Sequence, residues 1–190
     1  MIALAVAASI AGLAARADSQ AADRPLYKDP SAPVERRVED LLSRMTLEEK
    51  VAQMLSLWEH KDQVQTPGGD FAPDRASQAF PNGLGQIARP SDRRGVATPP
   101  TGAAGATAGQ GNRNARETAD YINAAQHWAV ERTRLGIPML FHEEALHGYV
   151  ARDSTSFPQA IALASTWDPA LAERVFNVAS REMRARGAQL

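Results

Sequence analysis

The feature that most constrains the fold is a short apolar run at 137–141, Ile-Pro-Met-Leu-Phe, which lies between a glycine and a cluster of ionisable residues. A continuous apolar run of this length is typical of a strand that is covered on both faces, as in a parallel sheet. Pro138 is compatible with a strand because it stands near the start of the run. The run therefore predicts a buried strand near 137–142.

Helical patterns flank this strand. Asn114 is a typical N-cap, and Asp168 followed by Pro169 is a typical helix start. The predicted helices are 35–44, 47–55, 114–134 and 169–186, and a further strand is predicted near 83–88. The side chains expected to face the core are Leu47, Val51, Met54 and Leu55 in the second helix, Ala115, Ala119, Ile122, Ala125 and Ala129 in the third, and Leu171, Val175, Val178, Ala179 and Met183 in the fourth. Residues 61–112 are expected to be mostly loop, because glycine and proline gather there. Alternating strands and helices predict an α/β fold with a parallel sheet.

The N-terminus has the pattern of a targeting segment. Residues 2–15 are apolar or small apart from Ser9, and the run ends in Ala-Arg-Ala at 15–17, a typical cleavage pattern. This run is shorter than the ~20 residues that a membrane-spanning helix needs. We therefore expect residues 1–17 to be a signal peptide and the mature protein to be periplasmic or secreted, with no membrane attachment. An apolar helix packed in the core is the alternative. Residues 18–33, with three prolines, predict an extended linker.

Composition excludes several classes of function. The chain has no cysteine, so disulfides, thiolate metal sites and cysteine nucleophiles are excluded. Its 21 basic and 22 acidic residues give a net charge of −1, and no nucleic-acid partner is expected, because such binding requires clustered cations. The glycine-rich stretch at 102–111 lacks the Gly-Lys-Ser/Thr of a phosphate-binding loop, and no Gly-x-Ser-x-Gly motif occurs. We expect no cofactor.

The ionisable cluster after the predicted strand is the candidate site, because chemistry in parallel α/β folds gathers where strands end. It contains His142, Glu143, Glu144 and His147. A zinc site is not expected, because the two histidines are five residues apart instead of the four of His-Glu-x-x-His, and a third ligand is not evident. A merely solvated polar loop is a second interpretation, in which Glu143 faces water. A carbohydrate site is the third, because a carboxylate accepts hydrogen bonds from neighbouring sugar hydroxyls.

Three blocks of the sequence are similar to a known family. They are VEDLLSRMTLEEKVAQM at 38–54, TRLGIPMLFHEEALHG at 133–148 and SFPQAIALASTWDP at 156–169. In this order they resemble the N-terminal part of the catalytic domain of glycoside hydrolase family 3, the β-glucosidase and β-xylosidase family. The family commonly has Asp-Ala-x-His-Gly where this chain has Glu144 to Gly148. The resemblance therefore implies that Glu144 is the sugar-binding carboxylate and that His147 belongs to the same substrate-binding site.

The resemblance also implies a fold and a mechanism. The family domain is a (β/α)₈ barrel, which typically needs ~250 residues, so residues 34–190 are expected to be an incomplete N-terminal portion with about three βα units. The family consists of retaining, exo-acting β-glycosidases that act on small β-glycosides or oligosaccharides in carbohydrate catabolism. Their nucleophile and acid/base lie beyond the part that this chain matches. No catalytic residue is assigned here, and the chain alone is expected to be inactive. A non-catalytic sugar-binding or scaffold module is the alternative.

Overall fold

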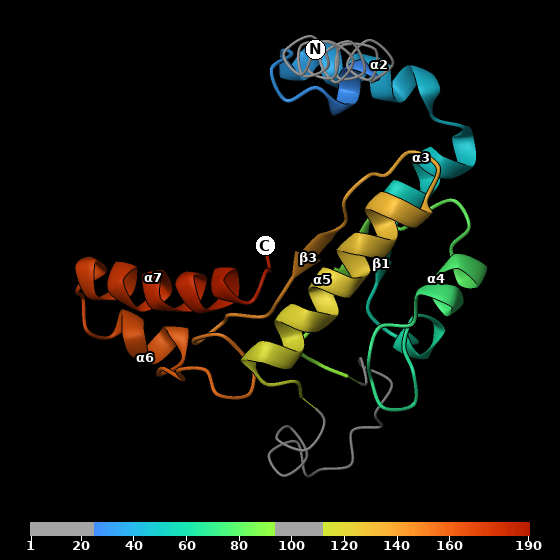
Figure 1. Ribbon diagram of the computed structural model, residues 1–190. Helices are drawn as coiled ribbons and strands as arrows, with labels where there is room; N and C mark the ends of the chain where they lie inside the picture. The colour runs from blue at the N-terminus through green and yellow to red at the C-terminus, as the bar shows by residue number, and fades with distance from the viewer. Residues whose placement is uncertain (1–24, 94–111) are drawn as a thin grey trace, which may run out of the picture. The chain divides into compact units, whose positions relative to one another are not determined.

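The computed structural model describes residues 25–93 and 112–190, which belong to two compact units, Met1–Thr46 and Leu47–Leu190 (Figure 1). The predicted signal peptide and the glycine-rich stretch at 102–111 lie outside the described residues. In the part of the chain that the structure describes, none of the helices combines the length and apolar character that crossing a membrane requires.

The described part of the first unit is a short 3-10 helix, η1 (Leu26–Lys28), followed by α2 (Val34–Arg44). The two segments are joined by polar contacts. The Tyr27 backbone N–H donates to Asp40 at 3.0 Å, and Arg37 Nε donates to the Tyr27 carbonyl at 3.1 Å. The helix expected at 35–44 is therefore confirmed, and η1 lies within the segment that was expected to be an extended linker.

The second unit contains a parallel sheet of three strands in the order β1 (Ser56–Leu57), β2 (Gln86–Ala88) and β3 (Leu140–His142) (Figure 1). Ser56 is paired with Gln86, and Ala88 is paired with His142. Because all strands run in the same direction, their carboxyl ends lie at one edge of the sheet. The predicted strands near 83–88 and 137–142 are confirmed, whereas β1 was not predicted.

Helices precede, connect and follow these strands. They are α3 (Leu47–Gln53), a 3-10 helix η2 (Lys61–Gln63), α4 (Pro73–Ala79), α5 (Ala115–Arg132), α6 (Ala160–Ala164) and α7 (Pro169–Ala185). Asn114 forms a capping box at the start of α5, since its side chain accepts from the Glu117 N–H at 2.9 Å and the Glu117 carboxylate accepts from the Asn114 N–H at 2.9 Å. Asp168 caps α7 by accepting from the Leu171 N–H at 2.9 Å.

The core lies between α5 and the sheet. Its fully or nearly fully buried side chains include Ile87, Phe141, Ile122, Ala125, Trp128 and Ala129. The Phe71 ring contacts Tyr121 edge-on, with the ring centroids 5.7 Å apart. The expected inner face of α5 is thus confirmed at Ile122, Ala125 and Ala129 and is wrong at Ala115, which is exposed. The aromatic side chains of this face, Tyr121 and Trp128, were not predicted. The strand β3 was expected to be covered on both faces. Phe141 is fully buried, but Leu140 on the other face is half exposed.

The loop expected across 61–112 contains a helix that the sequence analysis missed. Pro73 opens α4 at its first turn, where the fixed φ of proline favours a helix and the missing N–H is not needed. The Trp128 indole of α5 donates to Ser77 Oγ of α4 at 2.9 Å. The tertiary contact with α5 therefore stabilises a seven-residue helix in a segment whose composition predicts loop.

The expected apolar stripe of α3 is wrong. Leu47 is 72% exposed and Met54 is 84% exposed, whereas Glu49 and Ala52 are the buried residues of this helix. Arg134 holds the Glu49 carboxylate, with Nε donating to Oε1 at 2.7 Å. The end of α3 also lies against Gly85, the residue directly before β2, since a Cβ on Gly85 would come within 2.0 Å of the Gln53 carbonyl oxygen. An ion pair and a close backbone contact therefore fix α3, and the helix ends before Met54.

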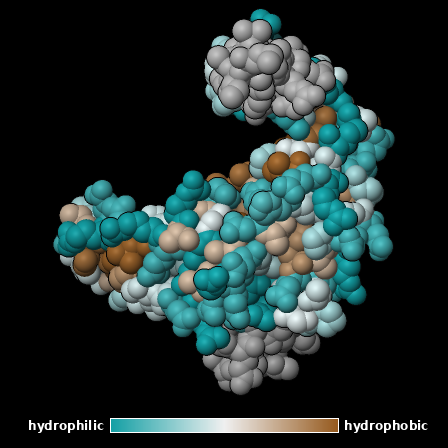
Figure 2. Space-filling view, in the orientation of Figure 1, coloured by the Kyte–Doolittle hydropathy of each residue, from teal (hydrophilic) through white to brown (hydrophobic). Residues whose placement is uncertain are grey.

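Exposed apolar side chains also occur over α6 and α7, where Figure 2 shows hydrophobic residues at the surface. The most exposed of them are Ile161 and Trp167, and Phe176 is partly exposed. Trp167 has a left-handed φ of 53° in the turn between the two helices. Val175 and Ala179 are the buried residues of α7, in agreement with part of its predicted inner face.

Candidate functional site

The candidate site lies at the carboxyl edge of the sheet, where β2 and β3 end. The Arg89 N–H, directly after β2, donates to the His142 carbonyl at 2.7 Å and ties the two strand ends together. The turn after β2 and the segment after β3 therefore start side by side. This arrangement brings residues of the predicted cluster next to residues that are about fifty positions earlier in the chain, such as Ser91.

Glu143 is buried, with 8% of its surface exposed, so the interpretation in which it faces water is wrong. Its carboxylate accepts three hydrogen bonds: from the Ser91 N–H at 2.8 Å, from Ser91 Oγ at 3.0 Å and from the Tyr149 hydroxyl at 2.9 Å. Buried carboxylates are tolerated when hydrogen bonds satisfy their oxygens. Glu143 therefore holds the turn after β2 against the segment after β3.

The environment of Glu143 is an enclosed ionic cluster. Burial raises the pKa of Glu143, and the hydrogen bonds from Ser91 and Tyr149 oppose this increase, as does the charge of Lys61. Burial lowers the pKa of Lys61 to about 8. The Lys61 ammonium donates to the carbonyls of Arg89 at 2.6 Å and Asp92 at 2.7 Å, and so fixes the same turn from the other side.

Tyr149 completes this cluster. Burial raises the pKa of its hydroxyl, and the negative charge of Glu143 raises it further. The Arg186 guanidinium lies over the Tyr149 ring, 4.9 Å from its centroid, and donates to the carbonyls of Arg152 at 2.8 Å and Asp153 at 3.1 Å. The end of α7 is thereby attached to the segment after β3, and the position of Tyr149 is fixed.

Glu144, the predicted sugar-binding carboxylate, differs from its neighbour. It is half buried, and within residues 25–93 and 112–190 its side chain has neither an ion pair nor a hydrogen bond. Its backbone carbonyl accepts from the Val150 N–H at 2.9 Å. The main chain at Glu144 is therefore held in a turn, while its carboxylate retains the capacity to accept hydrogen bonds from a ligand.

His147, the other predicted substrate-binding residue, lines a cavity of about 290 Å³. Tyr149, Arg152 and Ser154 also line this cavity, whereas Glu144 does not. Gly148 has a left-handed φ of 100°, and a Cβ there would lie 2.2 Å from the Thr155 carbonyl oxygen. The chain can turn sharply after His147 only because residue 148 is glycine.

His142 belongs to the same edge. The Gln86 side-chain amide donates to Nδ1 of His142, which leaves the proton of the neutral imidazole on Nε2. Burial lowers the pKa of His142, the charge of Glu144 opposes this change, and the charges of Lys61 and Arg89 reinforce it. His142 is therefore neutral at pH 7. No three histidine, aspartate or glutamate side chains of the described ranges come together as metal ligands.

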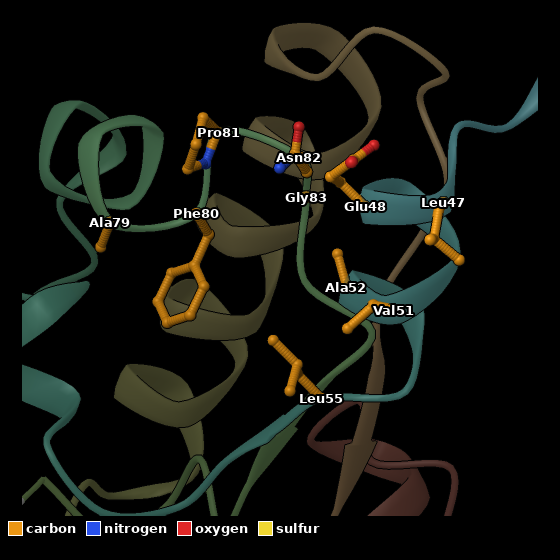
Figure 3. A pocket seen from close by; sticks show the side chains of 10 residues that line it. All are labelled: Leu47, Glu48, Val51, Ala52, Leu55, Ala79, Phe80, Pro81, Asn82 and Gly83. Carbon is orange, nitrogen blue, oxygen red and sulfur yellow. The ribbon is translucent and has the colours of Figure 1, made fainter.

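A second cavity, of about 370 Å³, lies on the side of the sheet where the strands begin. Leu55, just before β1, and Gly83, before β2, both line it. Figure 3 shows the side chains of Phe80, Val51 and Leu55 around a common space, with Glu48 and Asn82 in its lining. This cavity is predominantly apolar, and it lacks the groups that the carboxyl edge brings together. It explains why Val51 and Leu55 remain partly exposed in the second unit.

Sequence reasoning missed Ser91, Tyr149, Lys61 and Arg89. A signal was present for Ser91 and Arg89, because both follow a predicted strand and the carboxyl ends of parallel strands share one edge. Tyr149 directly follows the resemblance motif. Nothing local identified Lys61, which reaches the edge from η2.

The three-stranded parallel sheet with its flanking helices defines an α/β protein, and its candidate site lies where the strands end. The family described as glycosyl hydrolase family 3 N terminal domain matches residues 46–190. The chain therefore belongs to glycosyl hydrolase family 3, and the expected resemblance is confirmed.

Individual proteins with the names of glycosidases also match the chain. The chain is 32% identical over 171 residues to beta-glucosidase C of Emericella nidulans, a match that covers 86% of this chain and 24% of that protein. A beta-xylosidase of Formosa agariphila is 46% identical over 59 residues, covering 28% of this chain and 8% of the relative. The solved structure of a β-glucosidase from Erythrobacter marinus matches with a TM-score of 0.62 at 32% identity, over 87% of this chain and 19% of that one. The chain spans about a quarter or less of the length of these relatives.

Proposed function

We propose that this chain is the N-terminal portion of the catalytic barrel of a retaining, exo-acting β-glycosidase that hydrolyses β-glucosides or β-xylosides, and that it supplies part of the sugar-binding site. Family membership and the names of the relatives support the substrate class. The sheet order supports the partial barrel, because β1, β2 and β3 are parallel and neighbouring in sequence order, as successive strands of a (β/α)₈ barrel are.

The observation that carries the proposal is the contrast between Glu143 and Glu144. The first carboxylate is buried and already accepts three hydrogen bonds, so it has a structural role. The second has no side-chain partner in the described ranges and lies at the carboxyl edge. A carboxylate in this position binds two neighbouring hydroxyls of a sugar ring through charge-assisted hydrogen bonds. His147 then contributes the wall of the adjacent cavity.

The proposal assigns no catalytic residue to this chain. Retaining glycosidases need a nucleophile and an acid/base whose carboxyl groups lie ~5–5.5 Å apart on opposite sides of the scissile bond. The buried, hydrogen-bonded Glu143 is unsuited to either role, and the resemblance places both groups in a later part of the family's sequence. We therefore infer that the 190 residues alone bind a sugar without hydrolysing it.

The test compares Glu144→Ala with a matched control, Glu173→Ala, which removes an exposed carboxylate on α7. Binding of methyl β-D-glucoside and methyl β-D-xyloside is measured by NMR titration. Charge-assisted hydrogen bonds contribute roughly 1.5–3 kcal/mol, so Glu144→Ala is expected to weaken binding about tenfold or more, and the control not at all. Equal binding by both variants would refute the site. Turnover of an aryl β-glucoside by the purified chain would refute the absence of catalytic residues.

We also propose that the protein is periplasmic or secreted. The proposal rests on the sequence of residues 1–17, with its apolar run and the cleavage pattern that follows.

A further inference from the structure

Arg89 has a backbone conformation that is unusual for its residue type. Its φ is 48°, in the left-handed region that residues with a Cβ adopt rarely. Both sides of the residue are fixed: its N–H donates to the His142 carbonyl at 2.7 Å, and its own carbonyl accepts from the Lys61 ammonium at 2.6 Å and from the Asp92 N–H at 2.9 Å. Strained residues that the surroundings hold in this way gather at functional sites.

The side chain of Arg89 is also unusual, because its Nε is buried and has no hydrogen-bond acceptor among residues 25–93 and 112–190. The same described ranges offer its guanidinium no ion pair. Two other arginines near this edge do have hydrogen-bond acceptors. Arg113 donates to the Pro90 carbonyl at 2.6 Å and to Gln65 Oε1 at 3.0 Å, and Arg186 donates to two carbonyls. A buried donor without an acceptor is rare in a folded protein, so Arg89 has the capacity to bind a ligand oxygen.

Arg89 and Glu144 lie at the same edge of the sheet, after the ends of two neighbouring strands. Ala88 is paired with His142 across the sheet, so the residues that follow each of them emerge at the same edge. The charges of Arg89 and Glu144 both act on the His142 imidazole between the strand ends. The two side chains are thus a cation and an anion at one edge, and the described chain pairs neither of them.

We propose that Arg89 is a substrate-binding residue that acts together with Glu144, and that the two bind adjacent hydroxyls of one neutral sugar ring. A hydroxyl both donates and accepts, so a pair of neighbouring hydroxyls can donate to the carboxylate and accept from the guanidinium. A sugar acid satisfies Arg89 but is repelled by Glu144. The inference rests on the proposed function, since it takes Glu144 to be a sugar-binding residue, and it specifies a neutral sugar as the ligand.

The main test variant is Arg89→Asn. Asparagine tolerates the left-handed conformation, so this change removes the guanidinium and leaves the turn intact. Arg89→Lys retains the charge without the fork of donors, and Arg116→Gln is the matched control, because the Arg116 side chain is 89% exposed on α5. The probes are methyl β-D-glucoside, which is neutral, and methyl β-D-glucuronide, which is anionic, and dissociation constants are measured by NMR titration of the 190-residue chain.

We expect Arg89→Asn to weaken glucoside binding about tenfold, Arg89→Lys to weaken it less, and Arg116→Gln to leave it unchanged. The unaltered chain is expected to bind the glucoside more tightly than the glucuronide, and Glu144→Gln to reduce this preference. Unchanged glucoside affinity in Arg89→Asn, with the amide spectrum of the folded chain retained, would overturn the inference, as would a preference of the unaltered chain for the glucuronide. If Glu144→Ala weakens glucoside binding and Arg89→Asn leaves it unchanged, this inference fails and the proposed function stands. If the unaltered chain binds neither probe, both fail.

Discussion

Replacing Glu143 by alanine tests whether this buried carboxylate fixes the carboxyl edge of the sheet. The substitution removes the acceptor of three hydrogen bonds, two from Ser91 and one from Tyr149. A buried donor that loses its acceptor costs about 1–3 kcal/mol, so three donors set an upper limit of about 9 kcal/mol. The actual loss is smaller. The Ser91 and Tyr149 hydroxyls can reorient, and the removal of a buried charge also removes the desolvation cost that raises the Glu143 pKa. We expect a loss of about 2–4 kcal/mol in the free energy of unfolding.

The matched control is Glu143→Gln. Its carbonyl oxygen can accept from the Ser91 N–H and from the Tyr149 hydroxyl, and its amide can donate to Ser91 Oγ, which then reverses its role. The shape and most of the hydrogen bonds remain while the charge is lost. We expect Glu143→Gln to unfold within about 1 kcal/mol of the unaltered chain at pH 7.

The assay is urea unfolding, followed by circular dichroism and by tryptophan fluorescence, and hydrogen exchange at the Ser91 amide provides a local measurement. The Ser91 N–H is expected to exchange faster in Glu143→Ala than in Glu143→Gln. The reasoning is refuted if Glu143→Ala is as stable as the unaltered chain. It is also refuted if Glu143→Gln loses as much stability as the alanine variant, because the charge and not the hydrogen bonds would then be responsible.

Three further predictions concern Lys61, Gly148 and the N-terminus. Lys61 has a pKa of about 8 in the folded chain and about 10.4 in the unfolded chain, so the unfolded chain binds the proton more tightly. The free energy of unfolding therefore rises with pH between these two values. Urea unfolding at several pH values is expected to show an increase of about 2 kcal/mol from pH 8 to about 10, and this increase is expected to be absent in Lys61→Met. Gly148→Ala is expected to destabilise the chain by more than about 2 kcal/mol, because its Cβ would meet the Thr155 carbonyl. Gly68→Ala is expected to change the urea midpoint little, because a Cβ there makes only ordinary van der Waals contacts, with Thr66 Oγ1 at 3.6 Å and Asp70 Oδ2 at 3.8 Å. Mass spectrometry of exported protein is expected to find Asp18 as the first residue, and an intact cytoplasmic chain that begins before it would contradict the signal peptide.

Local signals predicted the helices and strands that they specify directly. The capping residues Asn114 and Asp168 are confirmed, since each accepts a hydrogen bond in the first turn of its own helix. The apolar run before His142 predicted β3, and the general rule for parallel sheets placed the site at its end. These elements could be predicted because the residues that determine them are close in sequence.

The parts that could not be predicted depend on partners far away in the chain. Glu143 is buried because Ser91, 52 positions earlier, donates two hydrogen bonds to it. The inward face of α3 is polar because Glu49 pairs with Arg134, 85 positions later. A polar side chain is predicted to face solvent when its hydrogen-bond partner lies in a distant segment of the sequence. Only the fold shows that the partner is present and that the side chain is buried.

The measurement that tests the central claim most directly is the location of sugar binding on the chain. Backbone amide shifts are followed by NMR as methyl β-D-glucoside is added to the 190-residue chain. We predict that the perturbed amides belong to the segments after β2 and β3, around Arg89, Glu144 and His147, and that Glu144→Ala needs about tenfold more glucoside to give the same shifts. Perturbations confined to the apolar cavity around Phe80, or shifts that persist unchanged in Glu144→Ala, would contradict a sugar site at the carboxyl edge of the sheet.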